Sequence, residues 1–358
     1  MTNPHLIINL DALTHNASVI KKSCCSLGIR ADSVVKCVCG DIQIANAILE
    51  GGIDTLLDSR MKNIISLKRD GLKCPIGLLR VPMLSELSLM ISYADWCLVS
   101  MPEAVMELEK ICATEKKEFK VLLMIDIGDL REGLWPDRID EIAGVFHKCR
   151  RVRCIGAGTN LGCFGGVMPS EDNLSRLVHI ALELKNDLLM EEWLISAGGT
   201  NIYFPLMNSE ITPGGINHLR IGGALLRGKC GTHDIKGLRR DTVLLSAEYV
   251  EIAKKPSKPI GTIGIDAFGN VPNFEDKGMR FRAIAALGKQ DVIPEDIDPL
   301  SEGINVLGAS SDHLVLDIED ASPRPKLGDS LKFSFKRYGG MLQAFNSDYV
   351  ERVYVKDK

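Results

Sequence analysis

Residues 33–50, SVVKCVCGDIQIANAILE, carry the pattern that decides the fold. A short β-branched run ends at Lys36, and an amphipathic segment with helical periodicity follows from Asp41. A strand followed by a helix predicts a βαβ unit, because the helix crosses over before the next parallel strand begins. The stretch therefore indicates the start of a parallel sheet.

The same alternation repeats along the chain as far as about residue 235. Apolar runs typical of buried strands lie at residues 33–36, 54–57, 76–79, 95–98, 120–126, 153–156, 193–196 and 218–221. Helical periodicity fills the intervals between them, as at residues 41–50, 59–69, 102–115, 136–148 and 170–189. Eight such units in a row favour a closed barrel over an open sheet. We therefore predict an α/β fold in which residues 10–235 form an N-terminal (β/α)8 barrel of the TIM type.

The pattern of the sequence changes after residue 240, where the alternation of strand-like and helical segments ends. Short strand-like runs, separated by turns rich in glycine, proline, asparagine and aspartate, lie at residues 243–252, 280–286, 305–307, 313–318 and 330–335. This pattern predicts a C-terminal all-β domain. Because residues 6–10 read as one more strand ahead of the first helix, we assign residues 1–9 and 240–358 together to this second domain.

Composition limits the classes of function. With 45% hydrophobic residues the chain can bury a large core, and its net charge of −4 argues against nucleic acid or an anionic membrane as a partner. No apolar run is long enough to span a bilayer, and the first residues lack a signal-peptide pattern. We therefore expect a cytoplasmic protein.

The cysteines and histidines do not form a metal-binding pattern. The eleven cysteines are scattered without a CxxC pair, and the seven histidines form no HExxH motif. We expect most of the cysteines to be reduced thiols in the core, and no metal to be bound.

Catalytic groups of such barrels lie where a strand ends and its loop begins. Lys36 closes the first strand, where partial desolvation would favour the free amine and Schiff-base formation; the alternative is a lysine that extends back to solvent. After the fifth strand, Asp129, Arg131 and Glu132 crowd one loop, which fits either an anion or phenolate site or a solvated ion-pair loop. After the sixth, Asn160 lies in a glycine-rich loop that allows close approach of the backbone to a ligand.

The loops after the seventh and eighth strands are the usual phosphate-binding loops of these barrels. Thr200 follows the seventh strand, while Gly222 and Gly223 follow the eighth. A hydroxyl and free backbone amides suit a phosphate, although each loop alone could equally be a plain turn. A reactive lysine facing a phosphate site across one barrel mouth is what a phosphorylated aldehyde cofactor requires.

Nearly the whole chain resembles a known family, the alanine-racemase-like enzymes of pyridoxal-phosphate (PLP) fold type III, and most closely their ornithine-racemase branch. Among the segments that carry the resemblance are VVKCVCGD (34–41), LLMIDIGDLREG (122–133), GTNLGCFGG (158–166), ISAGGTN (195–201), INHLRIGGALLRG (216–228) and YGGMLQAFNSDYV (338–350). These segments are long and specific, so a chance match is improbable.

The resemblance implies a role for several residues. Lys36 matches the lysine that holds the cofactor and moves a proton at Cα, and Arg131 matches an arginine near the phenolic oxygen of PLP. Arg220 matches the arginine that faces the pyridine nitrogen. Phosphate binders are matched by Thr200, Gly222, Gly223 and Tyr338. Ser311 and Asp312 match a segment that the partner subunit contributes on the substrate side, so the resemblance also implies a homodimer with a composite active site.

Two departures from the family pattern affect the expected chemistry. A racemase with two bases needs an acid or base on the second face of the cofactor. Alanine racemases use a tyrosine there, whereas the comparable stretch here, residues 265–269, reads IDAFG. By location, Asp312, His313 and Ser310 are the substitutes. Gly223 also stands where the ornithine-racemase pattern has a glutamate, and the loss of a carboxylate there could alter the substrate preference.

These observations lead to a functional prediction with alternatives. We predict a PLP-dependent amino-acid racemase, acting on ornithine or another basic amino acid, with Lys36 as the Schiff-base lysine and one acid/base. Asp129 and Glu132 are candidates to bind the distal ammonium of such a substrate. The alternatives are another PLP reaction on the same fold, such as a decarboxylase, lyase or aldolase, a non-catalytic PLP-binding protein, and a relative that has lost catalysis.

Overall fold

The structure is a computed structural model that describes residues 4–212 and 214–357. The chain divides into two compact units after Ala12 and after Arg239. The ends of the ranges assigned from the sequence to the second domain, residues 1–3 and 358, lie outside the described residues.

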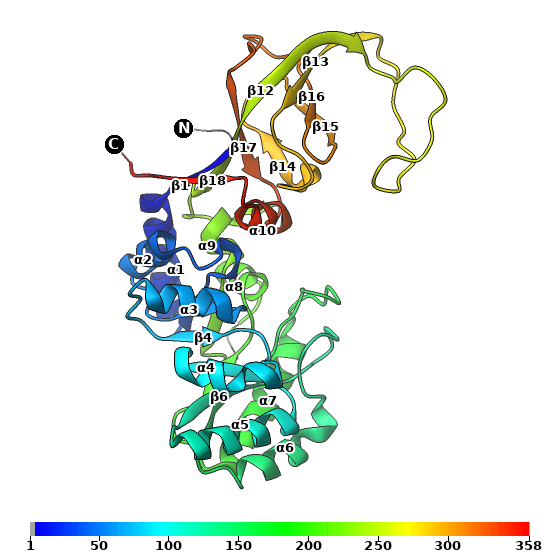
Figure 1. Ribbon diagram of the computed structural model, residues 1–358. Coiled ribbons are helices and arrows are strands. Elements are labelled where there is room, and N and C mark those ends of the chain that lie inside the picture. Colours follow the sequence, from blue (N-terminus) through cyan, green and yellow to red (C-terminus); the bar gives the residue numbers. More distant parts are fainter. Residues whose placement is uncertain (1–3, 213, 358) are drawn as a thin grey trace. The chain divides into compact units, whose positions relative to one another are not determined.

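The larger unit is a closed barrel of eight parallel strands that neighbour one another in chain order (Figure 1). The strands are β2 (Arg30–Val34), β3 (Leu56–Asp58), β4 (Ile76–Leu78), β5 (Trp96–Val99), β6 (Phe119–Met124), β7 (Val152–Gly158), β8 (Leu194–Ser196) and β9 (His218–Ile221). The pairing of β9 with β2 closes the ring. The predicted (β/α)8 barrel is confirmed, and each predicted strand overlaps an observed one.

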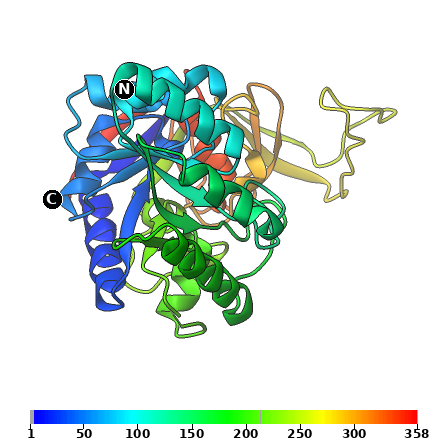
Figure 2. The same ribbon diagram turned by 90° about the horizontal axis from the view of Figure 1, so that it is seen from below.

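Helices lie on the outside of these strands (Figure 2). They are α1 (Leu10–Ser26), α2 (Ile42–Glu50), α3 (Met61–Arg69), α4 (Leu87–Tyr93), α5 (Pro102–Glu115), α6 (Ile139–Phe146), α7 (Glu171–Asp187), α8 (Thr200–Met207) and α9 (Gly223–Arg227). The short 3-10 turns η1 (Lys36–Val38), η2 (Leu84–Glu86) and η3 (Pro136–Arg138) precede three of them, and a two-stranded ribbon of β10 (Lys229–Cys230) and β11 (His233–Asp234) follows α9. The turn from β2 into α2 shows how the local sequence sets a boundary, because the carboxylate of Asp41 accepts hydrogen bonds from the amides of Gln43 and Ile44 and caps the helix.

The smaller unit is rich in antiparallel strands (Figure 1). Its main sheet has the order β14-β17-β12-β13-β16-β15. The bounds are β12 (Val243–Pro256), β13 (Met279–Ala285), β14 (Ile297–Pro299), β15 (Asn305–Ala309), β16 (Leu314–Asp317) and β17 (Ser330–Phe335). As the sequence predicted, the N-terminal strand β1 (His5–Asn9) joins this unit, where it pairs antiparallel with β12 and parallel with β18 (Glu351–Val355).

Two features of the smaller unit differ from the all-β prediction in detail. A helix, α10 (Tyr338–Asn346), lies between β17 and β18, and the 3-10 turn η4 (Pro294–Asp296) precedes β14. The glycines Gly339 and Gly340 lie in the first turn of α10 and allow close packing, because a Cβ on Gly340 would lie 2.6 Å from the Cβ of Asp296.

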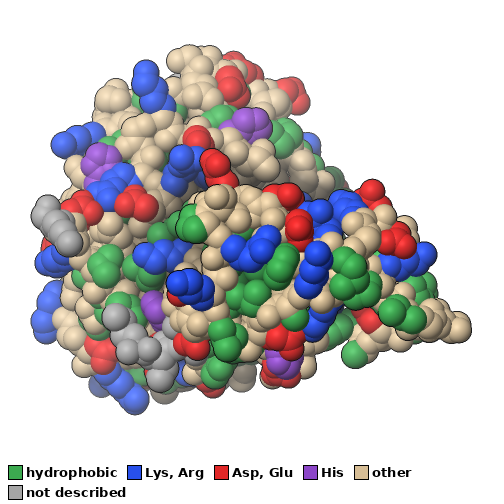
Figure 3. Space-filling model, turned by 90° about the horizontal axis from the view of Figure 1, so that it is seen from above, with side chains coloured by type: hydrophobic (Ala, Val, Ile, Leu, Met, Phe, Trp, Pro, Cys, Tyr) green, Lys and Arg blue, Asp and Glu red, His purple; other side chains and the backbone are tan. Residues whose placement is uncertain are grey.

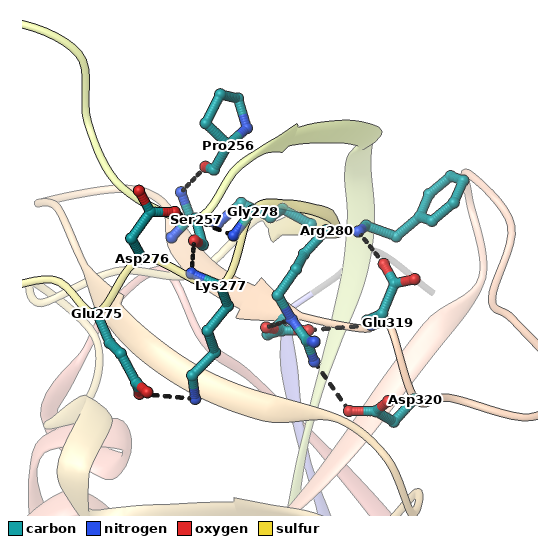
Figure 4. Close-up of polar contacts among 12 residues, drawn as sticks. Pro256, Ser257, Glu275, Asp276, Lys277, Gly278, Arg280, Glu319 and Asp320 are labelled. Atoms are coloured by element: carbon teal, nitrogen blue, oxygen red, sulfur yellow. Dashed lines mark hydrogen bonds and ion pairs between the residues drawn. The ribbon is translucent and has the colours of Figure 1, made fainter.

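A long segment, residues 257–278, joins β12 to β13 and is drawn in yellow in Figure 1. Its base is fixed by hydrogen bonds from the Ser257 amide to the Gly278 carbonyl (2.9 Å) and from the Lys277 amide to the Ser257 hydroxyl (2.6 Å) (Figure 4). Beyond this base, Arg280 of β13 pairs with Asp317 and Asp320. The segment therefore leaves the sheet from a well-anchored hairpin end.

Among the described residues, no helix is long and apolar enough to cross a membrane.

The barrel interior gives a first testable prediction. Leu122 of β6 is fully buried in a cluster with Leu57, Trp96, Leu98 and Met124. The change Leu122→Ala should lower the unfolding free energy of the barrel by about 2–5 kcal/mol, because it removes buried methyl groups and leaves a cavity.

Chemical denaturation followed by tryptophan fluorescence measures this loss. Leu182→Ala is the matched control, since Leu182 lies on the outside of α7 with 44% of its surface exposed. A loss no larger than that of the control would contradict the packing described here.

Candidate active site

Lys36 lies just beyond the end of β2 and opens the turn η1. Its side chain is half-buried, and within the described part of the chain its amine has no hydrogen bond or ion pair. Behind it, Cys39 adopts a left-handed conformation (φ 55°), which is uncommon for a residue other than glycine. An amine that is partly desolvated and free of carboxylate partners is available for covalent chemistry.

The loop after β6 holds Arg131. The carboxylate of Asp126 accepts the amides of Gly128 (2.8 Å) and Leu130 (3.2 Å), and Leu130 is again left-handed (φ 53°). Arg131 pairs with the adjacent Glu132. Burial alone would lower the pKa of Arg131, but the bonds to Glu132 outweigh it and raise the pKa, so this side chain stays cationic.

Asp129 ties the loop after β6 to the loop after β7. One of its oxygens accepts the amides of Gly162 (3.1 Å) and Val167 (3.2 Å), and the other those of Cys163 (3.3 Å) and Phe164 (3.0 Å). Burial would raise the pKa of Asp129, but these four backbone bonds lower it. The sequence suggested Asp129 as a ligand for a substrate ammonium, yet the fold uses its acceptors to shape the loops.

Asn160 follows β7 and presents an unsatisfied donor. Its side-chain nitrogen is buried and has no hydrogen-bond partner among the described residues. Buried amide groups normally find a partner, so this donor is open to a partner outside the described chain, such as water or a ligand.

The loops after β8 and β9 meet where α8 and α9 begin. The Thr200 hydroxyl at the start of α8 accepts the amide of Ala224 in α9 (2.9 Å). Gly222 lies against Val34, and a Cβ there would come within 3.0 Å of the Val34 carbonyl oxygen. The fold therefore brings together Thr200, Gly222 and Gly223 and places them beside the end of the strand that leads to Lys36. That they bind a phosphate stays a prediction.

Arg220 of β9 is a cation buried in the barrel. Its Nη2 donates to the Thr159 carbonyl (2.6 Å), and its Nη1 donates to the Ser196 hydroxyl and, at 3.4 Å, to the Ser196 carbonyl. Burial lowers the pKa of Arg220 to about 10, so it is still charged at neutral pH. The charges of Arg131 and Glu132 also act on this group, so the two arginines predicted for the site belong to one electrostatic environment.

Sequence reasoning missed the polar residues behind Arg220. Ser196, His218 and Asp32 are all buried and in contact with one another inside the barrel. The sequence did contain a signal for these residues. Arg30 and Asp32 alternate along one strand, and His218 and Arg220 along another, so polar side chains share one face of each strand.

The other predicted residues belong to the smaller unit. Ser311 donates from its hydroxyl to Asp312 (2.7 Å), and Gln290 donates to the other oxygen of Asp312 (2.5 Å). His313 is exposed, and Tyr338 is the first residue of α10. Their participation in the active site stays a prediction.

Comparison with known proteins supports the class of function. The chain is 38% identical over 357 residues to lysine racemase of Thermotoga maritima, covering 99% of each chain. It is also 38% identical to ornithine racemase of Acetoanaerobium sticklandii, covering 98% of this chain and 99% of the relative. These relatives assign the chain to the amino-acid racemases, which are isomerases.

The family follows from the same comparisons. The family described as "Alanine racemase, N-terminal domain" matches residues 8–229. Among solved structures, alanine racemase from Streptomyces coelicolor A3(2) has a TM-score of 0.77 at 18% identity, covering 98% of both chains. That of Clostridium difficile 630 has a TM-score of 0.75 at 18% identity, covering 100% of this chain and 97% of the other. The chain belongs to the alanine racemase family, with its barrel followed by a strand-rich domain.

The Asp129 contacts generate a prediction about the loops. The change Asp129→Asn should speed hydrogen exchange of the amides in residues 162–167 by at least about tenfold, because the new NH2 group faces amides that need acceptors. Asp137→Asn, on the exposed surface of η3, should leave these amides unchanged.

The pH dependence follows from the lowered pKa of Asp129. The native contacts favour the carboxylate, so their stabilisation is complete above the ordinary carboxyl range and is lost as the pH falls through the lowered, folded-state pKa. Protection of these amides should therefore persist at pH 5 and disappear only below about pH 4. Loss of protection at pH 5 would contradict this assignment.

Proposed function

We propose that this protein binds PLP at the barrel mouth and interconverts the L and D forms of a basic amino acid, lysine or ornithine. The proposal is carried by the free amine of Lys36 in a chain that is similar from end to end to lysine and ornithine racemases. A free amine at the end of a barrel strand, beside loops with unsatisfied donors, is the chemistry that an aldehyde cofactor needs.

The residues present fit the cofactor. Lys36 supplies the amine for its aldehyde, and the buried donor of Asn160 needs an acceptor of the kind that PLP carries. Arg131 remains cationic near a phenolate, while Thr200, Gly222 and Gly223 offer a hydroxyl and amides to a phosphate. Tyr338 is proposed to complete the phosphate site. When bound, PLP withdraws electrons from the substrate Cα and so makes its proton removable.

Arg220 has a distinct task at the pyridine nitrogen. A guanidinium donates hydrogen bonds and does not release its proton near neutral pH, so it leaves the nitrogen unprotonated. Arg220 would thereby limit electron withdrawal by bound PLP, which would favour return of the proton to Cα over competing reactions. This assignment favours racemisation over the decarboxylase and lyase alternatives.

Racemisation requires proton movement on both faces of Cα. Lys36 takes or returns the proton on one face. For the other face, we propose the partner subunit's segment that carries Ser311, Asp312 and His313. Because both oxygens of Asp312 already accept hydrogen bonds, the exposed imidazole of His313 is the better proton carrier of the two.

We propose a homodimer in which residues 257–278 contact the second copy. In this segment Ile260 is 92% exposed, Ile265 73% and Val271 70%. Apolar side chains, green in Figure 3, lie along this projecting part of the surface. The segment is nevertheless ordered by its own bonds, since Asp266 accepts the amides of Phe268 (2.9 Å) and Asn270 (2.8 Å). An ordered apolar segment of this kind is typical of a protein interface.

A cytoplasmic location is part of the proposal. Among the described residues none of the eleven cysteines forms a disulfide, although several are partly exposed, and reduced thiols are typical of a reducing compartment.

The proposed activity is tested with purified protein, PLP and both enantiomers of lysine, ornithine and alanine in deuterium oxide. We expect loss of optical activity with uptake of deuterium at Cα for lysine or ornithine, and a rate below one thousandth of this in Lys36→Ala. Lys62→Ala on α3 is the matched control and should keep full activity. Deuterium uptake without inversion would contradict the proposal.

The proposed dimer is tested by changing Ile260, Ile265 and Val271 together to serine. The triple variant should dimerise at least about tenfold more weakly, as measured by sedimentation velocity over a range of concentrations. Leu327→Ser is the control, because Leu327 is 67% exposed in the same unit but outside the segment. Equal dimerisation of the triple variant and the control would exclude the segment as the interface.

A further inference from the structure

A row of buried polar side chains crosses the interior of the barrel, where branched apolar residues are usual. It consists of Asp32, His218, Ser196 and Arg220. Asp32 and Arg220 are register partners on the neighbouring strands β2 and β9, and His218 lies two residues before Arg220 on the same strand. Residues two apart on a strand share a face, so His218 lies one layer deeper in the barrel than Arg220.

The members of the row contact one another in order. Arg220 Nη1 donates to the Ser196 hydroxyl, and that hydroxyl lies 2.8 Å from His218 Nδ1. His218 Nε2 lies 3.1 Å from Asp32 Oδ2, at ion-pair distance rather than in a well-aligned hydrogen bond. At the far end, Arg30 donates to both oxygens of Asp32, at 2.8 and 3.2 Å.

The chemistry of the two ends fixes the direction of every bond between them. Arginine can only donate and an ionised carboxylate can only accept. The Ser196 hydroxyl therefore accepts a hydrogen bond from Arg220 and donates one to Nδ1 of a neutral His218. The remaining ring proton of His218 is then on Nε2, facing Asp32. If His218 were doubly protonated, its Nδ1 and Arg220 Nη1 would both donate to the Ser196 hydroxyl.

The ionisation states agree with this arrangement. Burial is the main cause that lowers the pKa of His218, which keeps the ring neutral despite the nearby carboxylate. Burial would raise the pKa of Asp32, but its contacts with His218 and Arg30 outweigh this and lower the pKa. Asp32 is thus an ionised acceptor, held in place from the outer side by Arg30.

We propose that Ser196, His218 and Asp32 are positioning residues that lock the Arg220 guanidinium in the orientation in which it meets the ring nitrogen of PLP. This inference rests on the proposed function. Arg220 has five N–H donors, and Ser196 and Thr159 hold its two terminal nitrogens. The lock leaves the rest of the guanidinium for the cofactor and prevents its rotation. Cutting the row at Ser196 would allow the guanidinium to turn away.

The first test determines the protonation state of His218 in the holoprotein. Nitrogen-15 NMR of histidine-labelled protein, with the His218 signal assigned by its loss in His218→Gln, reports which ring nitrogen carries the proton. We expect a neutral ring with the proton on Nε2 at every pH from about 6 to 9. A proton on Nδ1, or a doubly protonated ring at pH 6 to 7, would overturn the proposed direction of the bonds.

The second test reads the effect on the cofactor. Ser196→Ala should weaken PLP binding about tenfold and shift the absorbance band of the bound cofactor, while Ser196→Thr, which keeps the hydroxyl, should restore both. Tyr203→Phe is the control, since it removes a part-buried hydrogen bond between α8 and α1, to Ser23 (2.9 Å), away from Arg220. An unchanged spectrum and affinity in a folded Ser196→Ala protein would overturn the positioning role.

Coupling within the row is a stricter requirement. Once Ser196→Ala has cut the row, adding His218→Gln should weaken PLP binding no further, because His218 acts only through Ser196. Independent, multiplied losses in the double variant would overturn the proposal.

The tests also separate this inference from the proposed function. If no amino acid is racemised while the NMR and cofactor results are as expected, the proposed reaction fails and the positioning row stands. If Lys36→Ala abolishes racemisation while Ser196→Ala leaves the cofactor unaffected, only the positioning row fails. A chain that takes up no PLP would overturn both.

Discussion

The buried guanidinium of Arg220 is the constraint on which the rest of the barrel depends. A charge removed from water costs several kcal/mol unless polar groups surround it. Here the compensation comes from Thr159 on the loop after β7, Ser196 on β8 and, through His218, Asp32 on β2. The contacts of one cation therefore link four adjacent strands of the barrel, β7, β8, β9 and β2.

The loops that follow these strands contain two kinds of polar residue, which differ in whether their hydrogen-bonding groups have partners. Groups that shape the mouth have their hydrogen-bonding capacity filled, as Asp129 does with four backbone amides. The amine of Lys36 and the amide nitrogen of Asn160, in contrast, have no partner in the described chain. Under the proposed function the first kind of residue shapes the site, and the second is open to the cofactor.

Much of the fold was predictable because it depends on local pattern. Short apolar runs between amphipathic segments predicted the strands of the barrel, and turn-rich spacing predicted the antiparallel sheet. The helix α10 was not predicted; its early glycines Gly339 and Gly340 lower helix propensity, and in the fold they pack closely against Asp296. The row behind Arg220 depends on barrel closure, which brings β2 beside β9 from distant parts of the sequence. A charged residue in a buried strand indicated that a partner must exist but not which one.

Racemisation also needs a proton carrier on the second face of Cα. In the stretch where alanine racemases carry a tyrosine, Asp266 is the single titratable side chain of residues 265–269. It is committed to the turn, because it accepts the amides of Phe268 and Asn270, and these bonds lower its pKa. A carboxylate that is needed to hold a turn is a poor proton carrier. Asp266 is therefore a poorer candidate for the second proton carrier than His313, the exposed residue that we propose for that task.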